Sequence, residues 1–325
     1  MRLGHTVNPN RQEILRKTQQ KGTHFAAKVW VVRCRHCSNI YGCNSGDFWE
    51  RKCPKCQRGK KGLRLPTEHN NEDWNRDELL IAFNVYSRIP FGTIHMRNPE
   101  IIRLAAILGR TVGSASYKLA NFARFDPALK ARGIRGMPRG SKGEAEIWSE
   151  FGSRPEALAF ESEKLLAERL ERRIEDIAEI DDRDLPAEGI EREATILVRV
   201  NQSFFRRRII SAYRCRCCVT GLGVPELLVA SHIIPWAQDP KNRMNPRNGL
   251  CLNAIHDRAF DRRLMWVDQN LAVRFSTRLR TEARKLEPAL EWLISFEGQK
   301  LILPPRFSPD HSFLQAHART CSRRG

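Results

Sequence analysis

Four cysteines near the N-terminus form two CxxC pairs, C-R-H-C and C-P-K-C, and 15 residues separate the pairs. Two such pairs can place four thiolates around one Zn²⁺. So short a segment has little apolar core of its own, so the metal would supply its folding energy. We therefore predict a zinc ribbon over residues 28–66. His36 and Cys43 lie between the outer cysteines and could replace one ligand, although the residue pattern favours a non-ligand role for each. The predicted zinc ligands are Cys34, Cys37, Cys53 and Cys56.

A second group of candidate catalytic and metal-binding residues lies in the C-terminal half of the chain. The stretch V-A-S-H-I-I-P-W, residues 229–236, reads as a buried strand with His232 inside it. A single histidine in such a strand is more often a core residue than a catalyst. Further along, Asp257 and Asp261 stand four residues apart, so a helix would place both carboxylates on one face, where they can converge on one cation.

Three motifs in this region resemble the HNH endonuclease family, and nearby parts of the chain resemble its bacterial restriction-type members more loosely. The three motifs are A-S-H-I-I-P-W, N-P-R-N-G-L and H-D-R-A-F-D, and they occur in this order at the family's spacing. The resemblance implies a ββα-metal fold, in which two strands and a helix surround one divalent cation. It also implies hydrolysis of phosphodiester bonds.

The resemblance also implies a role for each motif residue. His232 would be the general base that takes a proton from the attacking water. Asn248 would tie down the loop between strand and helix and orient that histidine. The family's helix ligands fall nine and thirteen residues after the asparagine, which gives Asp257 and Asp261. Their hard oxygens suit Mg²⁺, Mn²⁺ or another divalent ion. His256, one residue out of register, is kept as a catalytic residue, either a reserve ligand or a substrate contact.

The residue before the general base departs from the family pattern. Many members place a metal-binding Asp or His there, whereas this chain has Ser231, a poor ligand. We therefore expect the cation to be held mainly from the helix. The substitution leaves open that the site has low activity or none.

Arginines around these motifs are candidate phosphate contacts, with a solvated basic face as the alternative for any single one. Three lie on a helix expected before the first strand, and three follow the candidate metal ligands. They are Arg206, Arg207, Arg208, Arg258, Arg262 and Arg263.

The elements between the two candidate metal sites read as helical. Residues 73–190 are predicted to form a helical DNA-binding or connector domain. Asn98 before Pro99 marks a helix start, and Gly109 marks its end. The following basic segment, residues 110–124, suggests a helix-turn-helix, and a plain helical bundle is an equally good alternative. In the first case Lys118, Asn121 and Arg124 would face DNA.

An acidic helix is expected over residues 156–180, with an apolar stripe that serves either packing or a homodimer contact. Residues 181–189 read as a linker. Residues 195–325 would then form the nuclease domain, whose C-terminal extension packs onto it. The predicted fold class is therefore α+β, with a zinc ribbon, a central helical domain and a C-terminal ββα-metal HNH domain.

The charge pattern points to a polyanionic partner. The chain of 325 residues carries a formal charge of +19. Residues 1–66 carry 15 basic and 3 acidic residues, and residues 199–280 carry 15 and 5. Residues 144–193 carry 7 basic and 17 acidic residues, so an acidic block separates two basic ones. DNA is the expected partner, and residues 1–27 are expected to be a flexible basic arm.

The cellular location of the protein is predicted from two features that the sequence lacks, a membrane-spanning segment and a signal peptide. No apolar run is long enough to span a membrane, and the N-terminus has no apolar signal-peptide core. We therefore expect a cytoplasmic protein in which the ten cysteines are reduced.

Together these features predict a metal-dependent DNA endonuclease of restriction or phage defence. One alternative is a non-catalytic, zinc-dependent DNA-binding protein with a decayed nuclease domain, and another is an enzyme that cleaves RNA.

Overall fold

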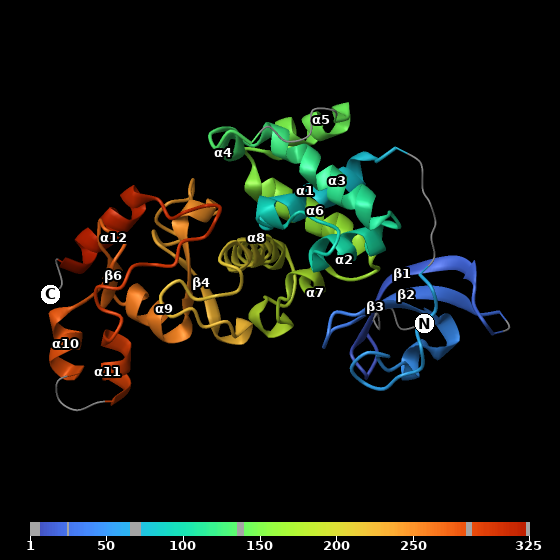
Figure 1. Cartoon of the computed structure of the whole chain (residues 1–325), viewed down its shortest axis with the longest axis horizontal. Coiled ribbons are helices and arrows are strands. Elements are labelled where there is room, and N and C mark those ends of the chain that lie inside the picture. Colours follow the sequence, from blue (N-terminus) through green and yellow to red (C-terminus); the bar gives the residue numbers. More distant parts are fainter. Residues whose placement is uncertain (1–6, 25, 66–72, 135–139, 284–287, 323–325) are drawn as a thin grey trace. The chain divides into compact units, whose positions relative to one another are not determined.

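The computed structural model describes residues 7–24, 26–65, 73–134, 140–283 and 288–322 (Figure 1). The chain is α+β, as predicted, and divides into two compact units. The first comprises Met1–Ser87 and Phe91–Val200, and the second comprises Arg88–Pro90 and Asn201–Gly325. The ribbon and the helical region thus share one unit. The boundary between the units lies inside a helix and not in the linker expected at residues 181–189.

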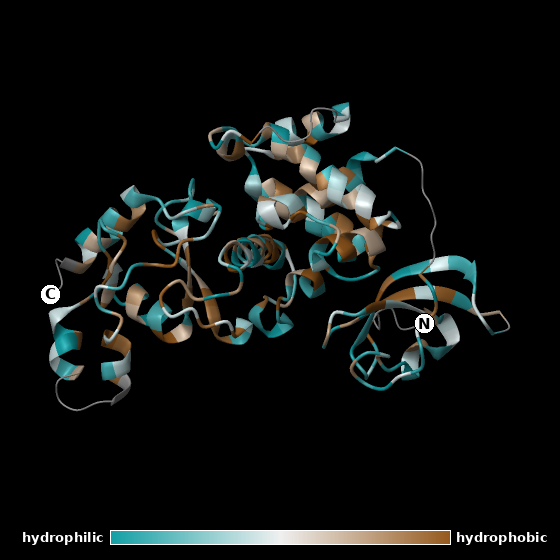
Figure 2. Ribbon diagram, viewed as in Figure 1, coloured by the Kyte–Doolittle hydropathy of each residue, from teal (hydrophilic) through white to brown (hydrophobic). Residues whose placement is uncertain are grey.

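The ribbon is a three-stranded antiparallel sheet in the order β1-β2-β3. Its strands are β1 (Gln12–Lys21), β2 (Lys28–Cys34) and β3 (Ile40–Asn44). The central strand β2 is mostly hydrophobic (Figure 2). Val32, Tyr41 and Phe48 form its small core together with the cysteines.

Strand β1 corrects the prediction of a flexible arm over residues 1–27. Residues 12–21 pair with β2, so the ribbon sheet begins before residue 28. This strand was not predicted from the sequence because two of its buried residues are polar and interrupt the apolar pattern that indicates a strand. Gln12 is buried and accepts a hydrogen bond from the Tyr41 hydroxyl at 2.8 Å. Glu13 is buried too, and it pairs with the guanidinium of Arg33 at 2.7 Å.

The helical part of the first unit packs around an aromatic core. Its rings include those of Phe83, Tyr86, Phe122 and Trp148. The helices are α1 (Arg76–Arg88), α2 (Pro99–Leu108), α3 (Val112–Phe122), α4 (Pro127–Lys130), α5 (Lys142–Phe151), α6 (Pro155–Arg169) and α7 (Ile174–Ala178). The predicted ends of α2 are confirmed: the Asn98 side chain caps it, and Gly109 ends it with a left-handed φ of 73°.

Two helices, α6 and α7, replace the single acidic helix expected over residues 156–180. The apolar stripe there is largely covered by the chain itself. Leu166, Leu170 and Ile177 are 8%, 4% and 7% exposed. Of the two alternatives for the stripe, packing within the subunit therefore accounts for these residues, and they offer no surface for a homodimer.

The second unit is built on a ββα arrangement. Strands β4 (Leu228–His232) and β5 (Gly249–Asn253) form an antiparallel pair, and α9 (Ala254–Asp261) follows directly. Helix α8 (Ile190–Ala212) starts in the first unit and ends in the second. The remaining elements are β6 (Met265–Val267), β7 (Val273–Phe275), α10 (Thr277–Ala283), α11 (Pro288–Ile294) and α12 (His311–Ser322). Helix α12 packs against β6.

Among the described residues, no helix is both long and apolar enough to cross a lipid bilayer.

Candidate active site and metal centre

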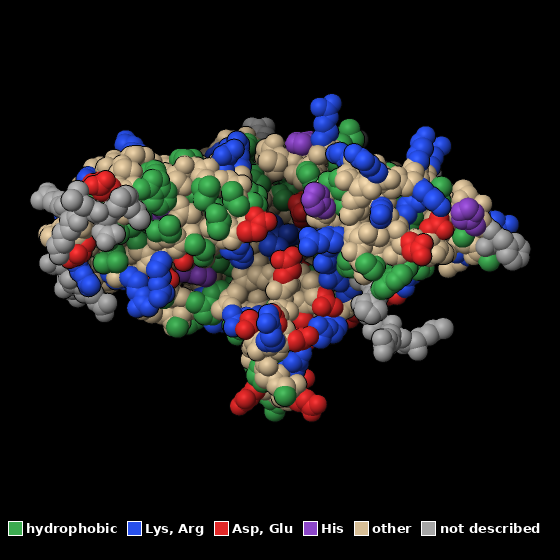
Figure 3. All heavy atoms as spheres, turned by 90° about the horizontal axis from the view of Figure 1, so that it is seen from below, with side chains coloured by type: hydrophobic (Ala, Val, Ile, Leu, Met, Phe, Trp, Pro, Cys, Tyr) green, Lys and Arg blue, Asp and Glu red, His purple; other side chains and the backbone are tan. Residues whose placement is uncertain are grey.

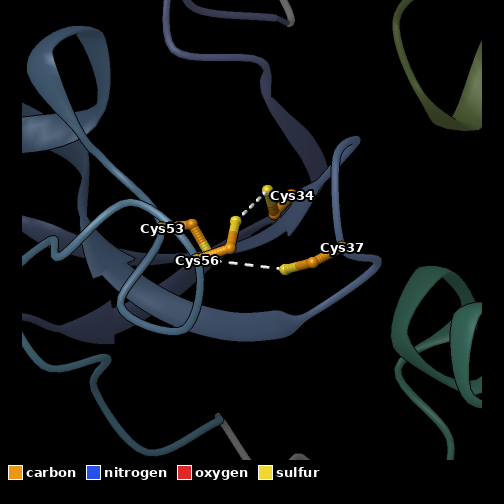
Figure 4. A group of neighbouring side chains, drawn as sticks. All are labelled: Cys34, Cys37, Cys53 and Cys56. Atoms are coloured by element: carbon orange, nitrogen blue, oxygen red, sulfur yellow. Dashed lines mark hydrogen bonds between the residues drawn. The ribbon is translucent and has the colours of Figure 1, made fainter.

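The four predicted cysteines converge in the ribbon. Cys34 ends β2 and Cys37 lies in the turn after it, whereas Cys53 and Cys56 lie on the loop after η1 (Ser45–Glu50), and the two pairs face each other (Figure 4). The sulfurs of Cys34 and Cys56 are 3.6 Å apart, as are those of Cys37 and Cys53. A tetrahedral zinc with Zn–S bonds of about 2.3 Å requires sulfurs about 3.8 Å apart. The donor set and its spacing therefore fit a structural Zn²⁺.

The surroundings of Cys34 favour a thiolate. Burial alone would raise the pKa of the Cys34 thiol, but hydrogen bonds from the backbone N–H groups of Cys37 and His36 help lower it to about 7. Among the described residues, these four cysteines are the only group of three or more His, Cys, Asp or Glu side chains whose ligand atoms all lie within 4.8 Å of one another. Cys43 is buried in the ribbon core and is outside the group, as expected.

His232 ends β4, where its ring is held from two sides. Its Nε2 lies 2.9 Å from the backbone oxygen of Arg243. The ring stacks on Phe205 of α8 at a centroid distance of 3.9 Å. Burial lowers the pKa of His232, and the Arg243 carbonyl and the charge of Asp261 oppose this effect only in part. The imidazole is therefore fixed in orientation and favoured in its neutral form.

Gly249 allows the helix that supports this histidine to come close. It pairs with His232 across the β4–β5 ladder. A Cβ at this position would lie 2.5 Å from Cδ1 of Ile209 and 2.8 Å from Cζ of Phe205. Only glycine leaves room for α8 to pack here, so the N-G step of the second motif helps to place Phe205 beneath the imidazole.

Asn248 is fully buried and ties together the loop that joins β4 to β5. Its Oδ1 accepts a hydrogen bond from the backbone N–H of Ile234 at 2.8 Å. Its Nδ2 donates to the backbone oxygens of Ile234 and Asn242 at 3.1 and 3.2 Å. Since Asn242 immediately precedes Arg243, this clamp also positions the carbonyl that holds His232.

Asp257 and Asp261 lie on α9, four residues apart, close enough to interact electrostatically. Burial raises the pKa of the Asp257 carboxyl, and the charge of Asp261 raises it further. The Ser231 hydroxyl is near enough to lower it in part. Ser231 is only 3% exposed, and its Oγ has no hydrogen-bond partner of good geometry among the described residues. Asp257, beside this buried hydroxyl, and Asp261, exposed one turn further along α9, offer oxygen ligands of the kind that a divalent cation takes.

The position of His256 contradicts its predicted role as a catalytic residue. The side chain is fully buried, and its Nδ1 lies 3.0 Å from Oδ1 of Asn253, the residue that caps α9. Its ring contacts Trp292 and Phe296 at centroid distances of 5.6 and 5.3 Å. Burial lowers the pKa of His256 to about 4. This histidine packs the helix onto an aromatic cluster and is inaccessible to substrate.

The predicted DNA contacts on α3 are also contradicted, because they are engaged within the protein. Lys118 Nζ lies 2.8 Å from Oε1 of the fully buried Glu144 on α5. Asn121, itself 1% exposed, donates to the same oxygen at 3.1 Å. Arg124 lies 3.7 Å from the other Glu144 oxygen. The face expected to read DNA therefore packs on α5, which favours the helical-bundle alternative.

The six arginines predicted near the nuclease motifs differ in exposure. Arg206, Arg258 and Arg262 are exposed and can reach a ligand. Arg208 is half-buried, with its guanidinium 4.6 Å from the ring centroid of Phe307. Arg207 and Arg263 are half-buried as well. The first three are therefore the better candidates for phosphate contacts.

Comparison with known proteins agrees with this geometry. The model of a family described as HNH endonuclease matches residues 217–268, which contain β4, β5 and α9. The chain carries an HNH endonuclease domain. No curated protein matches the chain. HNH domains are nuclease domains, and HNH nucleases use divalent metals, so this domain indicates a nucleic-acid substrate and nuclease activity in general.

Sequence reasoning missed two supports of the HNH site, the ring of Phe205 and the carbonyl of Arg243. Phe205 lies 27 positions before His232, and Arg243 acts through its backbone. Neither contact leaves a motif of its own. The nearest available signal was the N-G step, because a glycine inside a strand often marks a close approach of another element.

Proposed function

We propose that this protein is a metal-dependent DNA endonuclease that hydrolyses phosphodiester bonds. The observation that carries the proposal is the state of His232 in the HNH domain. This histidine ends the first strand of the ββα arrangement, its ring is immobilised, and its pKa is lowered. A buried histidine kept neutral at one defined orientation suits general-base catalysis.

The contact with Arg243 selects one nitrogen of His232 as the base. A carbonyl oxygen can only accept a hydrogen bond, so in the neutral imidazole Nε2 must carry the hydrogen. The lone pair then belongs to Nδ1, which would take the proton from the attacking water. Asn248 acts as a positioning residue in this scheme, because it holds the loop that supplies the carbonyl.

Asp257 and Asp261 are the residues that would hold Mg²⁺ or Mn²⁺. When bound, such an ion supplies charge neutralisation at the scissile phosphate and the leaving oxygen. The chain provides the matching negative charge on one face of α9, and Arg206, Arg258 and Arg262 would orient the DNA backbone by contacting flanking phosphates.

Plasmid cleavage tests the proposal directly. The purified protein should nick or cut plasmid DNA with Mg²⁺ or Mn²⁺, and His232→Ala should lower the rate by about 100-fold or more. His311→Ala, an exposed histidine in the same unit, is the matched control. Equal cutting by the His232 variant would refute the mechanism.

We further propose that the enzyme acts in the cytoplasm in restriction or phage defence. This proposal draws on the looser resemblance of the parts of the chain near the motifs to restriction-type members. A homodimer would supply two HNH domains for two DNA strands, and the solution mass of the protein tests it. Cleavage assays on methylated and unmethylated DNA test the defence role, which predicts that one of the two substrates is spared.

Ser231 favours a second candidate function, a zinc-dependent DNA-binding protein whose nuclease domain has decayed. A hydroxyl at this position supplies no negative charge for a cation, unlike a carboxylate. This candidate predicts DNA binding without cleavage in every divalent metal tested. Cleavage that depends on Asp257 would exclude it.

A further inference from the structure

The ribbon carries a basic loop that the zinc site does not need. Residues 51–65 include seven Lys or Arg and no Asp or Glu. Arg51 is buried, and the other six are exposed. The exposed cations are Lys52, Lys55, Arg58, Lys60, Lys61 and Arg64. Lys and Arg side chains project from the ribbon at the right of Figure 3.

These six charges are not used within the described part of the protein. No ion pair joins any of them to another described residue. A zinc ion with four thiolates has a formal charge of −2, so it offsets only two of the six positive charges. The loop therefore presents a net positive surface to solvent.

The loop is also held in one shape. The buried guanidinium of Arg51 donates from Nη2 to the backbone oxygens of Lys60 and Lys61, at 2.8 Å each. Gly42 and Leu63 exchange two backbone hydrogen bonds, of 3.1 and 2.8 Å. The loop backbone is thus tied to the sheet while its charged side chains stay free. Little conformational order needs to be gained when a ligand binds.

The residue types of the loop indicate which polyanion it fits. Four of the six exposed cations are lysines, which bind phosphates as point charges without reading bases. Single-stranded nucleic acids are held by positive charge together with stacking aromatic rings. No aromatic residue occurs between Arg51 and Leu65. These features fit the phosphate backbone of a duplex.

We infer that this basic loop is a second DNA-binding surface, which contacts backbone phosphates of double-stranded DNA independently of sequence. It lies in the first unit, whereas the HNH domain lies in the second. The inference rests on the proposed function for the choice of DNA as the polyanion. The loop would raise the affinity of the enzyme for duplex DNA and take no part in the chemical step.

The test compares two quadruple variants of the full chain. The loop variant carries Lys55→Gln, Arg58→Gln, Lys60→Gln and Lys61→Gln. The control variant removes four exposed cations from the helical part: Lys130→Gln, Lys142→Gln, Arg154→Gln and Lys164→Gln. Both carry His232→Ala so that DNA stays intact. Affinity for a random duplex is measured over a range of salt concentrations, and zinc content is measured for both.

The loop variant should bind duplex DNA more weakly. The slope of log affinity against log salt should fall by about 0.9 for each phosphate that the protein no longer neutralises, and therefore by about 3 to 4 for four residues. The control variant should change the slope by less than about 1. Equal changes of the salt slope in the two variants would overturn the inference. Loop-dependent binding that is tighter for single-stranded DNA or RNA than for duplex DNA would overturn it as well.

A second measurement avoids substitutions altogether. In the unaltered loop, duplex DNA should protect Lys55, Lys60 and Lys61 from an amine-acylating reagent, and should not protect Lys130 or Lys142. Absence of this protection would also overturn the inference. Loop-dependent binding without any cleavage by the wild-type protein would refute only the proposed function. Cleavage without loop-dependent binding would refute only this inference.

Discussion

At the scale of single residues, His232 must be neutral to act as a base. Burial places its pKa below the ordinary value of 6.5. The base is therefore more than half neutral at pH 6.5, approaches full availability as the pH rises further, and becomes inactive as the pH falls through the lowered pKa. A metal cation bound nearby would lower the pKa of His232 further, because its positive charge disfavours the protonated imidazole. Single-turnover cleavage rates at saturating metal should show an acidic limb centred below pH 6.5, whereas a limb at 6.5 or higher would argue against this base.

Asp257 illustrates a conflict between stability and function. Its pKa in the folded, metal-free protein is raised, so folding opposes its ionisation. The cost is absent well below pH 3.8, grows as the pH rises from 3.8 to the raised pKa of the folded protein, and is complete above that pKa. Asp257→Asn removes the cost of ionising this carboxyl in the folded protein. The Tm of the metal-free protein at pH 7 should therefore rise, on the order of 2 °C.

The same variant should lose cleavage and most of the rise in Tm that Mn²⁺ produces in the wild-type protein. Glu226→Gln, an exposed substitution in the same unit, is the control for lost negative charge. Thermal unfolding with and without Mn²⁺ measures both effects. A variant that is less stable without metal, or equally stabilised by it, would show that Asp257 is not a metal ligand.

At the scale of elements, Glu144 joins α5 to α3. Burial alone would raise its pKa, but hydrogen bonds from Lys118, Ser141 and Asn121 lower it below 4.5. The stability it contributes is therefore present above pH 4.5 and is lost as the pH falls through the folded pKa. Glu144→Gln leaves Lys118 without its charge partner and should cost about 3 kcal/mol at pH 7.

Urea unfolding measures this cost. Glu146→Gln removes an exposed carboxyl from the same helix and should change the unfolding free energy by less than about 0.5 kcal/mol. Since the network is internal, Glu144→Gln should destabilise the helical part at pH 7 and lose that effect at low pH. Equal stability of the two variants would mean that Lys118 and Arg124 are not held by Glu144 and remain available to DNA.

The elements that sequence reasoning predicted well are those with local patterns. The paired CxxC motifs, the Asn98-Pro99 helix start and the HNH motifs each lie within a short stretch. The errors share a different cause. Strand β1 depends on the partners of buried Gln12 and Glu13, and the prediction that α3 faces DNA failed because Glu144 lies 26 positions after Lys118. Long-range pairing of polar groups leaves no periodic pattern in the sequence.

At the scale of the whole molecule, the acidic block serves internal pairing. Arg173 Nη2 lies 2.8 Å from the Asp182 carboxylate. Arg192 Nη2 lies 3.1 Å from Glu175. Acidic residues here also neutralise basic ones, as Glu144 neutralises Lys118. The positive charge that remains for a polyanion is therefore concentrated in the ribbon and in the HNH unit.

This distribution predicts that zinc supports binding and not chemistry. Cys53→Ser removes a buried ligand, so the ribbon should lose its zinc and its fold. The basic loop would then no longer be pre-organised, and affinity for duplex DNA should fall at least as far as in the loop variant. The HNH domain lies in the other unit, so the cleavage rate at saturating DNA should stay within about twofold.

The control is Cys215→Ser, which changes an exposed cysteine outside the zinc site and should retain zinc and affinity for duplex DNA. Loss of the saturated rate together with zinc would show instead that the ribbon takes part in the reaction.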